Sequence, residues 1–169
     1  MYEEEKIVFG NDETTQPRSK YLLRDNIYEN IPSLLYYGGS DTAFLESISI
    51  PFDTPKVAEI CKEHILSFTK DDDIVFDFFS GSATIAHGVM LANMTDNGNR
   101  KYIMVQLPEV TDEKSEAHKA GYNTICEIGE ERIRRAGDKI KAEHPDANID
   151  IGFRVFEIAD TNIKWNELE

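Results

Sequence analysis

The sequence predicts an α/β protein in which helices and strands alternate as in one half of a doubly wound parallel sheet. Two short apolar runs, at 74–79 and 102–107, have the composition of buried strands. Apolar residues recur at helical spacing in segments before, between and after these runs. From residue 51 onward the expected order is helix, strand, helix, strand, helix, strand.

Residues 1–50 are predicted to form an irregular N-terminal segment. Short apolar stretches at 7–9 and 34–37 are separated by glycine, asparagine and aspartate residues, which favour turns. One hairpin or a few short strands is the most regular structure expected there. The remaining residues, 51–169, are predicted to form the α/β half-domain.

The first expected helix runs from Val57 to Phe68. Asp71-Asp72-Asp73 then breaks the chain and leads into the run at 74–79. This run is apolar on both pleat faces, which predicts a central strand covered on both sides. A turn of small residues follows it, and then a helix at about 83–92.

The second expected strand, 102–107, ends at Pro108. A long charged loop leads to a helix at about 123–143, whose isoleucines share one stripe. A third strand is suggested by four apolar residues: Phe153, Val155, Phe156 and Ile158.

Composition limits the classes of function. The 169 residues are 40% hydrophobic, which is enough for a core and excludes wholesale disorder. The net charge of −14 repels nucleic acid on average, so contact with DNA would need a local basic patch or a second polypeptide. Cys61 and Cys126 lie in apolar-periodic segments without metal-ligand spacing, and no apolar run approaches the roughly 18 residues of a membrane span. A cytoplasmic protein with reduced cysteines, no metal site and no membrane contact is expected.

The turn at 80–84 is the first candidate site. Doubly wound sheets bind ligands at the carboxyl ends of their strands, Gly81 permits close approach of a ligand, and a helix N-terminus favours an anion. An ordinary tight loop is the alternative. Ser82-Ala83-Thr84 lacks the lysine of a phosphate-binding loop, and Gly81 and Gly88 lack dinucleotide-fingerprint spacing, so a bound NAD is not expected.

Residues 77–109, DFFSGSATIAHGVMLANMTDNGNRKYIMVQLPE, resemble the S-adenosylmethionine-binding stretch of the modification subunit of type III restriction-modification systems. These subunits are β-group adenine-N6 DNA methyltransferases. FGNDETTQPR (9–18) is similar to the family's segment after the target-recognition region, and FDTPK (52–56) to its motif X. Residues 113–140 and 150–165 resemble the family's C-terminal portion, so the resemblance covers nearly the whole chain.

The resemblance implies a Rossmann-like methyltransferase sheet, of which this chain would hold a three-strand half. It implies S-adenosyl-L-methionine as the cofactor, site-specific DNA adenine-N6 methylation as the function, and the restriction subunit of the same system as a partner. It also implies two groups of residues around the methionine end of the cofactor. The motif X group is Phe52, Asp53, Thr54, Pro55 and Lys56, and the wall group is Asp77, Phe78, Phe79, Ser80, Gly81 and Ser82.

Three further positions complete the implied cofactor site. Thr84 would offer its hydroxyl to the cofactor carboxylate, with helix capping as the alternative. Gln106 stands where many methyltransferases place an acid for the ribose hydroxyls, and Glu109 is a second contributor. Ala83 replaces the family's glycine, which weakens the expected affinity.

Other residues have simpler interpretations. Thr54 and Pro55 would suit the start of a helix, as a cap and a first helical residue. His87 is expected to pack or stack rather than to catalyse. The basic residues of 132–141 are interleaved with glutamates, which favours a solvated helix face over contact with the DNA backbone.

The catalytic half of the family is missing from this sequence. Methylation of adenine requires a flipped base, which the family holds with an Asp/Asn-Pro-Pro-Tyr/Phe tetrapeptide. The six prolines, at 17, 32, 51, 55, 108 and 145, include no Pro-Pro pair. We therefore expect no catalytic residue here, a truncated product or excised fragment, and contact with DNA only through a complementary or full-length methyltransferase chain.

Two expectations follow for assembly. The strand at 74–79 would leave an unpaired edge toward the missing half, which predicts a homo-oligomer unless residues 1–50 fold over that edge. The alternative function is a non-enzymatic remnant, an interaction module that binds a partner methyltransferase half.

Overall fold

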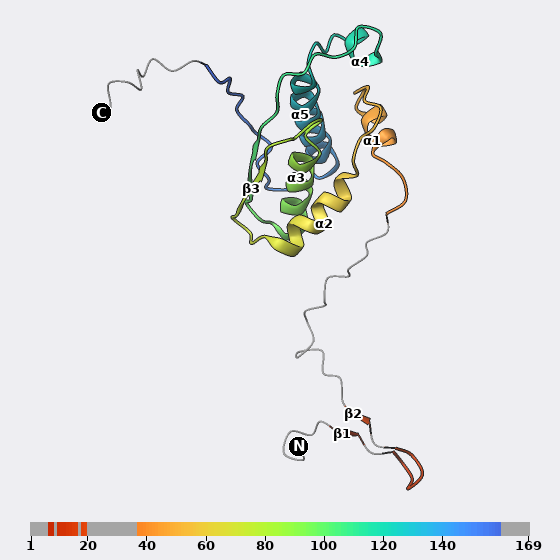
Figure 1. Ribbon diagram of the computed structural model, residues 1–169. Coiled ribbons are helices and arrows are strands. Elements are labelled where there is room, and N and C mark those ends of the chain that lie inside the picture. Colours follow the sequence, from red (N-terminus) through yellow and green to blue (C-terminus); the bar gives the residue numbers. More distant parts are fainter. Residues whose placement is uncertain (1–6, 9, 17, 20–36, 160–169) are drawn as a thin grey trace, which may run out of the picture. The chain divides into compact units, whose positions relative to one another are not determined.

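The computed structural model in Figure 1 describes residues 7–8, 10–16, 18–19 and 37–159. The chain divides into two compact units, Met1–Tyr36 and Tyr37–Glu169. In the first unit β1 (Ile7–Val8) pairs antiparallel with β2 (Arg18–Ser19). This confirms the expected hairpin. The apolar stretch at 34–37 lies, except for Tyr37, outside the described residues, as do residues 160–165 of the resemblance.

The second unit has seven described elements. They are α1 (Thr42–Ser47), α2 (Ala58–Phe68), β3 (Ile74–Asp77), α3 (Thr84–Asp96), β4 (Lys101–Met104), α4 (Glu116–Lys119) and α5 (Ile125–Glu143). The predicted helices at 57–68, 83–92 and 123–143 are confirmed, and both predicted strands are present but shorter. None of the described helices is long and apolar enough to cross a membrane.

Helix α1 falls in the segment expected to be irregular. Leu45, Ile48 and Ile50 are buried there, in a cluster with Ile128 of α5. Burial of this apolar group accounts for a six-residue helix that has no side-chain cap of its own. Residues 37–50 therefore belong to the larger unit.

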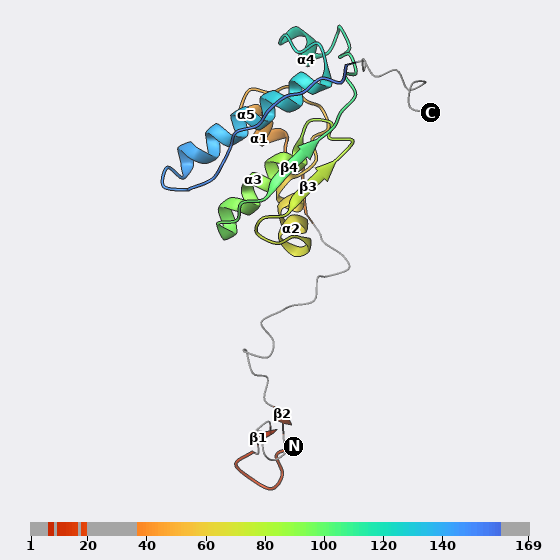
Figure 2. The same cartoon turned by 90° about the vertical axis from the view of Figure 1, so that its left-hand side faces the viewer.

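Strands β3 and β4 form a parallel pair, with Ile74 opposite Lys101 and Asp77 opposite Met104. Figures 1 and 2 show the helices on one side of this pair, and α3 connects its two strands. Val75 and Tyr102 pack on the helices. The residues that alternate with them, Phe76 and Ile103, are 57% and 51% exposed. The prediction that 74–79 is covered on both sides is therefore wrong for the part of the chain that the structure describes.

The predicted third strand is also wrong. Residues 151–159 contain no strand, so the described sheet of this unit has two strands rather than three. Ile149, Ile151 and Phe153 pack against the α3–α5 core, and the guanidinium of Arg134 lies 5.3 Å from the centre of the Phe153 ring. These side-chain contacts hold the segment against helix α5 instead of a sheet edge. The apolar residues that follow, Val155, Phe156 and Ile158, are exposed.

Three apolar clusters support the second unit. Buried residues of α3 and α5 form the largest, and α1 with α5 and α2 with α3 form the other two. Helix α5 contributes to two of the three. Its N-terminus is capped by Thr124, whose hydroxyl accepts from the amide of Glu127 at 3.3 Å. This helix is therefore well packed and capped, and it supports the turn between β3 and α3.

Candidate cofactor site

The turn at 80–84 is attached to the chain that leaves β4. The amide of Ser80 donates to the carbonyl of Val105 at 3.1 Å, and the amide of Gly81 donates to Oε1 of Gln106 at 2.8 Å. A third bond, from the amide of Ala83 to the carbonyl of Ser80 at 2.8 Å, closes the turn. The carboxyl ends of the two strands therefore meet at this turn, as the sequence predicts.

Two residues of the turn have left-handed backbones. Gly81 has φ +52° and Ala83 has φ +58°. A Cβ at Gly81 would meet no protein atom within 4 Å, so open space lies beside it. The conformation at Ala83 is the one that glycine adopts most readily, which explains physically why a glycine suits this position. The methyl group of Ala83 is buried in the α3–α5 core instead.

Helix α5 contacts the underside of the turn through Gly129. A Cβ built on Gly129 would lie 3.1 Å from the carbonyl oxygen of Gly81 and 3.4 Å from Cβ of Ala83. Any larger residue would push the turn outward. Gly129 is a supporting residue that the sequence reasoning missed, although its place on the buried stripe, one position after Ile128, is visible in the sequence.

Arg132, one helical turn after Gly129, is fully buried. Its Nη1 donates to the hydroxyl oxygens of Ser82 at 3.2 Å and Thr84 at 2.8 Å, and its Nη2 lies 2.7 Å from Oδ2 of Asp41. Burial lowers the pKa of Arg132, and the charge of Asp41 opposes this effect. The prediction that Arg132 lies on a solvated face is wrong, because it stands four residues from both Ile128 and Ala136 on the buried stripe.

Both capping interpretations are wrong. Thr84 is the first residue of α3 and makes no cap; its buried hydroxyl accepts from Arg132. Helix α2 begins at Ala58, and the amide of Ala58 donates to Oδ2 of Asp41 at 2.9 Å, so Thr54 is not its cap. Asp41 therefore links the start of α2 to Arg132.

A pocket of about 260 Å³ brings together four of the predicted residues, Phe52, Asp53, Thr54 and Glu109. Its remaining walls come from the start of α5 and from the loop that contains α4. Asp112 and Glu116 make the lining strongly acidic. The other lining residues are Pro51, Val110, Thr111, Ser115, Ala117, Ile125 and Ile128. An acidic pocket of this kind favours a cationic ligand.

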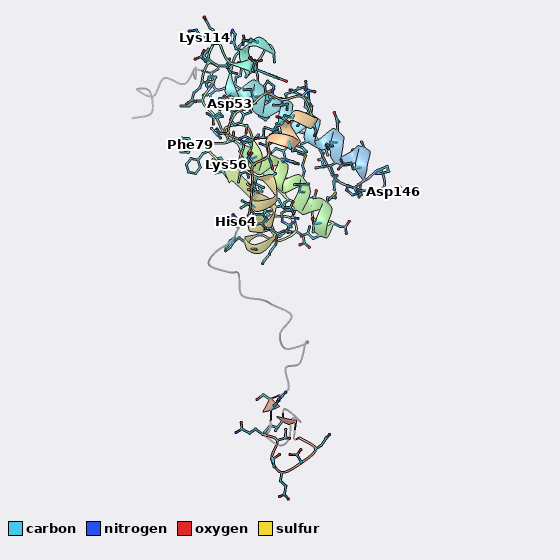
Figure 3. The ribbon with its side chains drawn as sticks, turned by 90° about the vertical axis from the view of Figure 1, so that its right-hand side faces the viewer. Asp53, Lys56, His64, Phe79, Lys114 and Asp146 are labelled. Atoms are coloured by element: carbon cyan, nitrogen blue, oxygen red, sulfur yellow. The ribbon has the colours of Figure 1, made fainter. Side chains whose placement is uncertain are left out.

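The other motif X and wall residues do not line the pocket. Pro55 is buried and Lys56 is exposed. Asp77 accepts from the amide of Phe79 at 3.0 Å. Figure 3 shows Asp53, Lys56 and Phe79 along the same side of the unit in that view. The rings of Phe78 and Phe79 are mostly exposed and lie 5.1 Å apart.

Gln106 is already engaged in hydrogen bonds. Its Oε1 accepts from Gly81, and its Nε2 donates to the carbonyl of Leu107 at 3.2 Å. In this arrangement the amide supports the turn, so a contact with ribose would have to use remaining hydrogen-bonding capacity of this side chain.

His87 packs as expected. It is buried, and its ring stacks on Phe44 with the centroids 4.5 Å apart. Burial, with a smaller effect from Arg132, lowers the pKa of His87 to about 3. The imidazole is therefore neutral at physiological pH, which suits packing rather than acid–base chemistry.

The remaining arginines of the basic cluster on α5 are paired locally. Arg134 binds Glu130 at 2.9 Å and Glu131 at 3.0 Å, and Arg135 binds Glu131 at 2.7 Å. Lys139 donates to the hydroxyl of Ser47 at 2.8 Å. Among the described residues, no group of three or more histidine, cysteine, aspartate or glutamate side chains could hold a metal ion.

Residues 8–136 match the sequence profile of the DNA methylase family of N6 and N4 methyltransferases. The chain is 36% identical over 155 residues to the Mod subunit of the type III restriction-modification enzyme StyLTI of Salmonella typhimurium, and 34% identical over 164 residues to the EcoP15I Mod subunit of Escherichia coli. These alignments cover 92% and 94% of the chain. The type II methyltransferase M.KpnI of Klebsiella pneumoniae is 33% identical over 87 residues, or 52% of the chain.

The matched part is a small share of these relatives. The chain spans 22% of the StyLTI subunit, 24% of the EcoP15I subunit and 21% of M.KpnI. The expected resemblance to type III modification subunits is confirmed over most of the chain. Because the family profile matches well over half of the residues, this chain belongs to the DNA methylase family.

Proposed function

We propose that this chain forms the S-adenosyl-L-methionine-binding part of a site-specific DNA adenine-N6 methyltransferase of a type III restriction-modification system. One observation carries the proposal: the turn at 80–84 lies at the carboxyl ends of two parallel strands, with open space beside Gly81. The similarity to type III Mod subunits supports the choice of system.

The chemistry of the residues fits this cofactor. S-adenosylmethionine has a carboxylate, an ammonium group and a sulfonium, and it supplies the methyl group that is transferred. The hydroxyls of Ser82 and Thr84 accept from Arg132, so each retains a proton that it could donate to a carboxylate. The acidic pocket beside Asp53 and Glu109 would favour the cationic groups.

We propose that the cofactor lies between the turn at 80–84 and the motif X residues. Ser80, Gly81, Ser82 and Thr84 would hold the methionine end, with Asp77, Phe78 and Phe79 beside them. The motif X residues Asp53, Thr54, Pro55 and Lys56 would form the opposite wall. Gln106 supports the turn, and Glu109 would bind the ribose side.

We propose that the chain alone does not methylate DNA. It contains no Pro-Pro pair with which to hold a flipped adenine, and most cations of α5 are paired with glutamates. A complementary methyltransferase chain would supply DNA binding and catalysis, and the restriction subunit would be a further partner. The cytoplasm, where its two free thiols stay reduced, is the proposed location.

Calorimetric titration with S-adenosylmethionine tests the binding function. Saturable binding to one site is expected, with no transfer of labelled methyl groups to DNA of mixed sequence. The absence of binding would contradict the proposal. Labelled adenine above background would contradict the claim that this chain lacks the catalytic half.

The exposed face of the sheet favours a second candidate, the interaction module. Phe76 lies opposite Ile103 in the register of the pair. Six large apolar side chains of the two strands and of the residues that follow them are exposed: Ile74, Phe76, Phe78, Ile103, Val105 and Leu107. They are 40–68% exposed, and within the described residues β3 is paired along one edge only. Such a face marks a protein interface or an assembly site.

The interaction module predicts binding of a partner methyltransferase half. Separately, the unpaired edge of β3 predicts a dimer or a larger assembly of this chain, unless residues 1–50 fold over that edge. Light scattering measures the assembly state, and Phe76→Lys should shift it toward the monomer. A monomeric parent protein whose β3 amides exchange rapidly would contradict self-assembly. Cofactor binding by that monomer would still support the first candidate.

A further inference from the structure

We propose that Arg132 is a positioning residue for the cofactor turn. This inference rests on the proposed function, because it assigns Arg132 to the same site. The guanidinium joins three segments that are distant in sequence: α5, the turn before α3, and Asp41 ahead of α2. It would set the direction of the groups that meet the cofactor without touching the cofactor itself.

The burial of Arg132 supports a positioning role, because stability alone does not explain a buried charge at this place. A fully buried guanidinium loses its hydration, and the single carboxylate of Asp41 compensates its charge. The Nε atom is buried without a hydrogen-bond partner among the described residues. Stability alone gives no reason for a charge that is incompletely satisfied, since an apolar residue often packs equally well at such a site.

The contacts to the turn suggest what this charge does. Guanidinium is only a donor, so the oxygens of Ser82 and Thr84 must accept from it. Each hydroxyl hydrogen then has to point away from Arg132. Two O–H donors that do not face Arg132 would suit a carboxylate ligand, such as that of an amino acid.

The chain contains a matched control at the other end of α3. Arg100 is 5% exposed, its Nε donates to the hydroxyl of Thr69 at 2.7 Å, and its Nη2 lies 2.7 Å from Asp96. Like Arg132, it is a buried arginine with one close carboxylate; it binds one hydroxyl-bearing side chain, whereas Arg132 binds two. None of its contacts involves the turn.

The experiment compares Arg132→Lys with Arg100→Lys. Lysine keeps the charge but lacks the planar fork that reaches a carboxylate and two hydroxyls together. Urea unfolding first identifies a temperature at which both variants are folded in the absence of urea. Binding of S-adenosylmethionine is then measured by calorimetry at that temperature. Arg132→Lys should weaken binding about tenfold or more, as expected for lost charge-assisted hydrogen bonds. Arg100→Lys should bind like the parent while losing comparable stability.

A second variant keeps the test decisive if Arg132→Lys does not fold. Thr84→Val preserves shape but removes the oxygen that Arg132 orients, so it should weaken binding as well. Exchange of the Gly81 amide should accelerate in Arg132→Lys and stay at the parent rate in Arg100→Lys. These results together would support the positioning role.

The contrary outcomes are distinct. If the parent binds and Arg132→Lys binds equally well, or if both lysine variants lose affinity equally, the positioning role is wrong and the proposed function stands. If Thr84→Val is the variant tested, parent-like affinity has the same meaning. If the parent itself does not bind S-adenosylmethionine, the proposed function fails and this inference fails with it.

Discussion

The two ends of helix α3 both contact a buried arginine, but the surroundings of the two arginines differ. Each end is held by a buried arginine, Arg132 at the N-terminus and Arg100 at the C-terminus. At the C-terminal end Arg100 binds Asp96 through two nitrogens, at 2.9 and 2.7 Å, and the amide and carbonyl of Arg100 bond to Asn93. That end closes on Asn97, whose left-handed backbone is common for asparagine after a helix.

The N-terminal end is less completely satisfied. Gly81 and Ala83 are both left-handed, Nε of Arg132 has no partner among the described residues, and open space lies beside the turn. Strain and unsatisfied polar groups concentrate at functional sites, whereas a closed network is typical of structural support. The comparison therefore supports the proposal that the N-terminal end of α3 binds a ligand, whereas the C-terminal end serves stability.

The largest expected difference is in the free energy of unfolding, when the carboxylate partner of each arginine is removed separately. Asp41→Ala leaves the charge of Arg132 buried and alone and removes the acceptor of the Ala58 amide, so it should cost about 3 kcal/mol of unfolding free energy. Asp96→Ala should cost about 1 kcal/mol, because that side chain is 30% exposed and Asp71 lies 3.9 Å from Arg100. Urea unfolding followed by circular dichroism measures both; equal losses would contradict the contrast.

Between pH 7 and pH 5, the N-terminal end should show the larger pH effect, because the hydrogen bond from Arg100 at the other end lowers the pKa of Asp96 from a value that is already acidic. His87 titrates at about 3 in the folded protein and near 6.5 when unfolded. Because the folded pKa is depressed, unfolding takes up a proton below pH 6.5, and stability is lost progressively as pH falls from about 6.5 to 3. From pH 7 to pH 5 the loss from this group should be about 2 kcal/mol.

His87→Phe keeps an aromatic ring against Phe44 and should flatten the stability profile over this interval. Urea unfolding at pH 7, 6 and 5 measures the difference between the parent and the variant. A variant whose stability declines as steeply as that of the parent would show that another group causes the decline.

The smallest expected change in stability comes from replacing the residues with a left-handed backbone, Ala83 and Asn97, by glycine. Ala83→Gly relieves about 1 kcal/mol of strain and loses a buried methyl of similar value, so stability should change by less than about 1 kcal/mol. Cofactor binding should equal or exceed that of the parent. Asn97→Gly, at the other end, should leave binding unchanged. Paired titrations test this, and weaker binding by Ala83→Gly would contradict the expected benefit of glycine.

The helices and strands that surround this site could be predicted because their signals are local. The apolar spacing of α2, α3 and α5 and the runs at β3 and β4 are read from a few neighbouring residues. The prediction of a third strand was wrong because a strand also requires a neighbouring strand to pair with, which a local pattern does not reveal. Phe153 instead packs in the core, under the guanidinium of Arg134.

The turn could be located from its small residues, but its support could not. Asp41 and Thr84 lie 91 and 48 positions from Arg132, and no local pattern connects them. The charge of Arg132 also matches that of its solvated neighbours on α5, so only its place on the apolar stripe distinguishes it. The pocket at Asp53 and Glu109 likewise joins residues that are remote in sequence.

The central claim is that a ligand occupies the space beside Gly81. A leucine at Gly81 would fill that space and strain a left-handed backbone, so Gly81→Leu should abolish binding of S-adenosylmethionine. Gly39 is a control for the strain, because it also has a positive φ and open space around a Cβ. Calorimetric titration of the parent, Gly81→Leu and Gly39→Leu, each confirmed as folded by circular dichroism, is the direct test. We predict binding by the parent and Gly39→Leu and none by Gly81→Leu; parent-like binding by Gly81→Leu would contradict the assignment of the turn as the cofactor site.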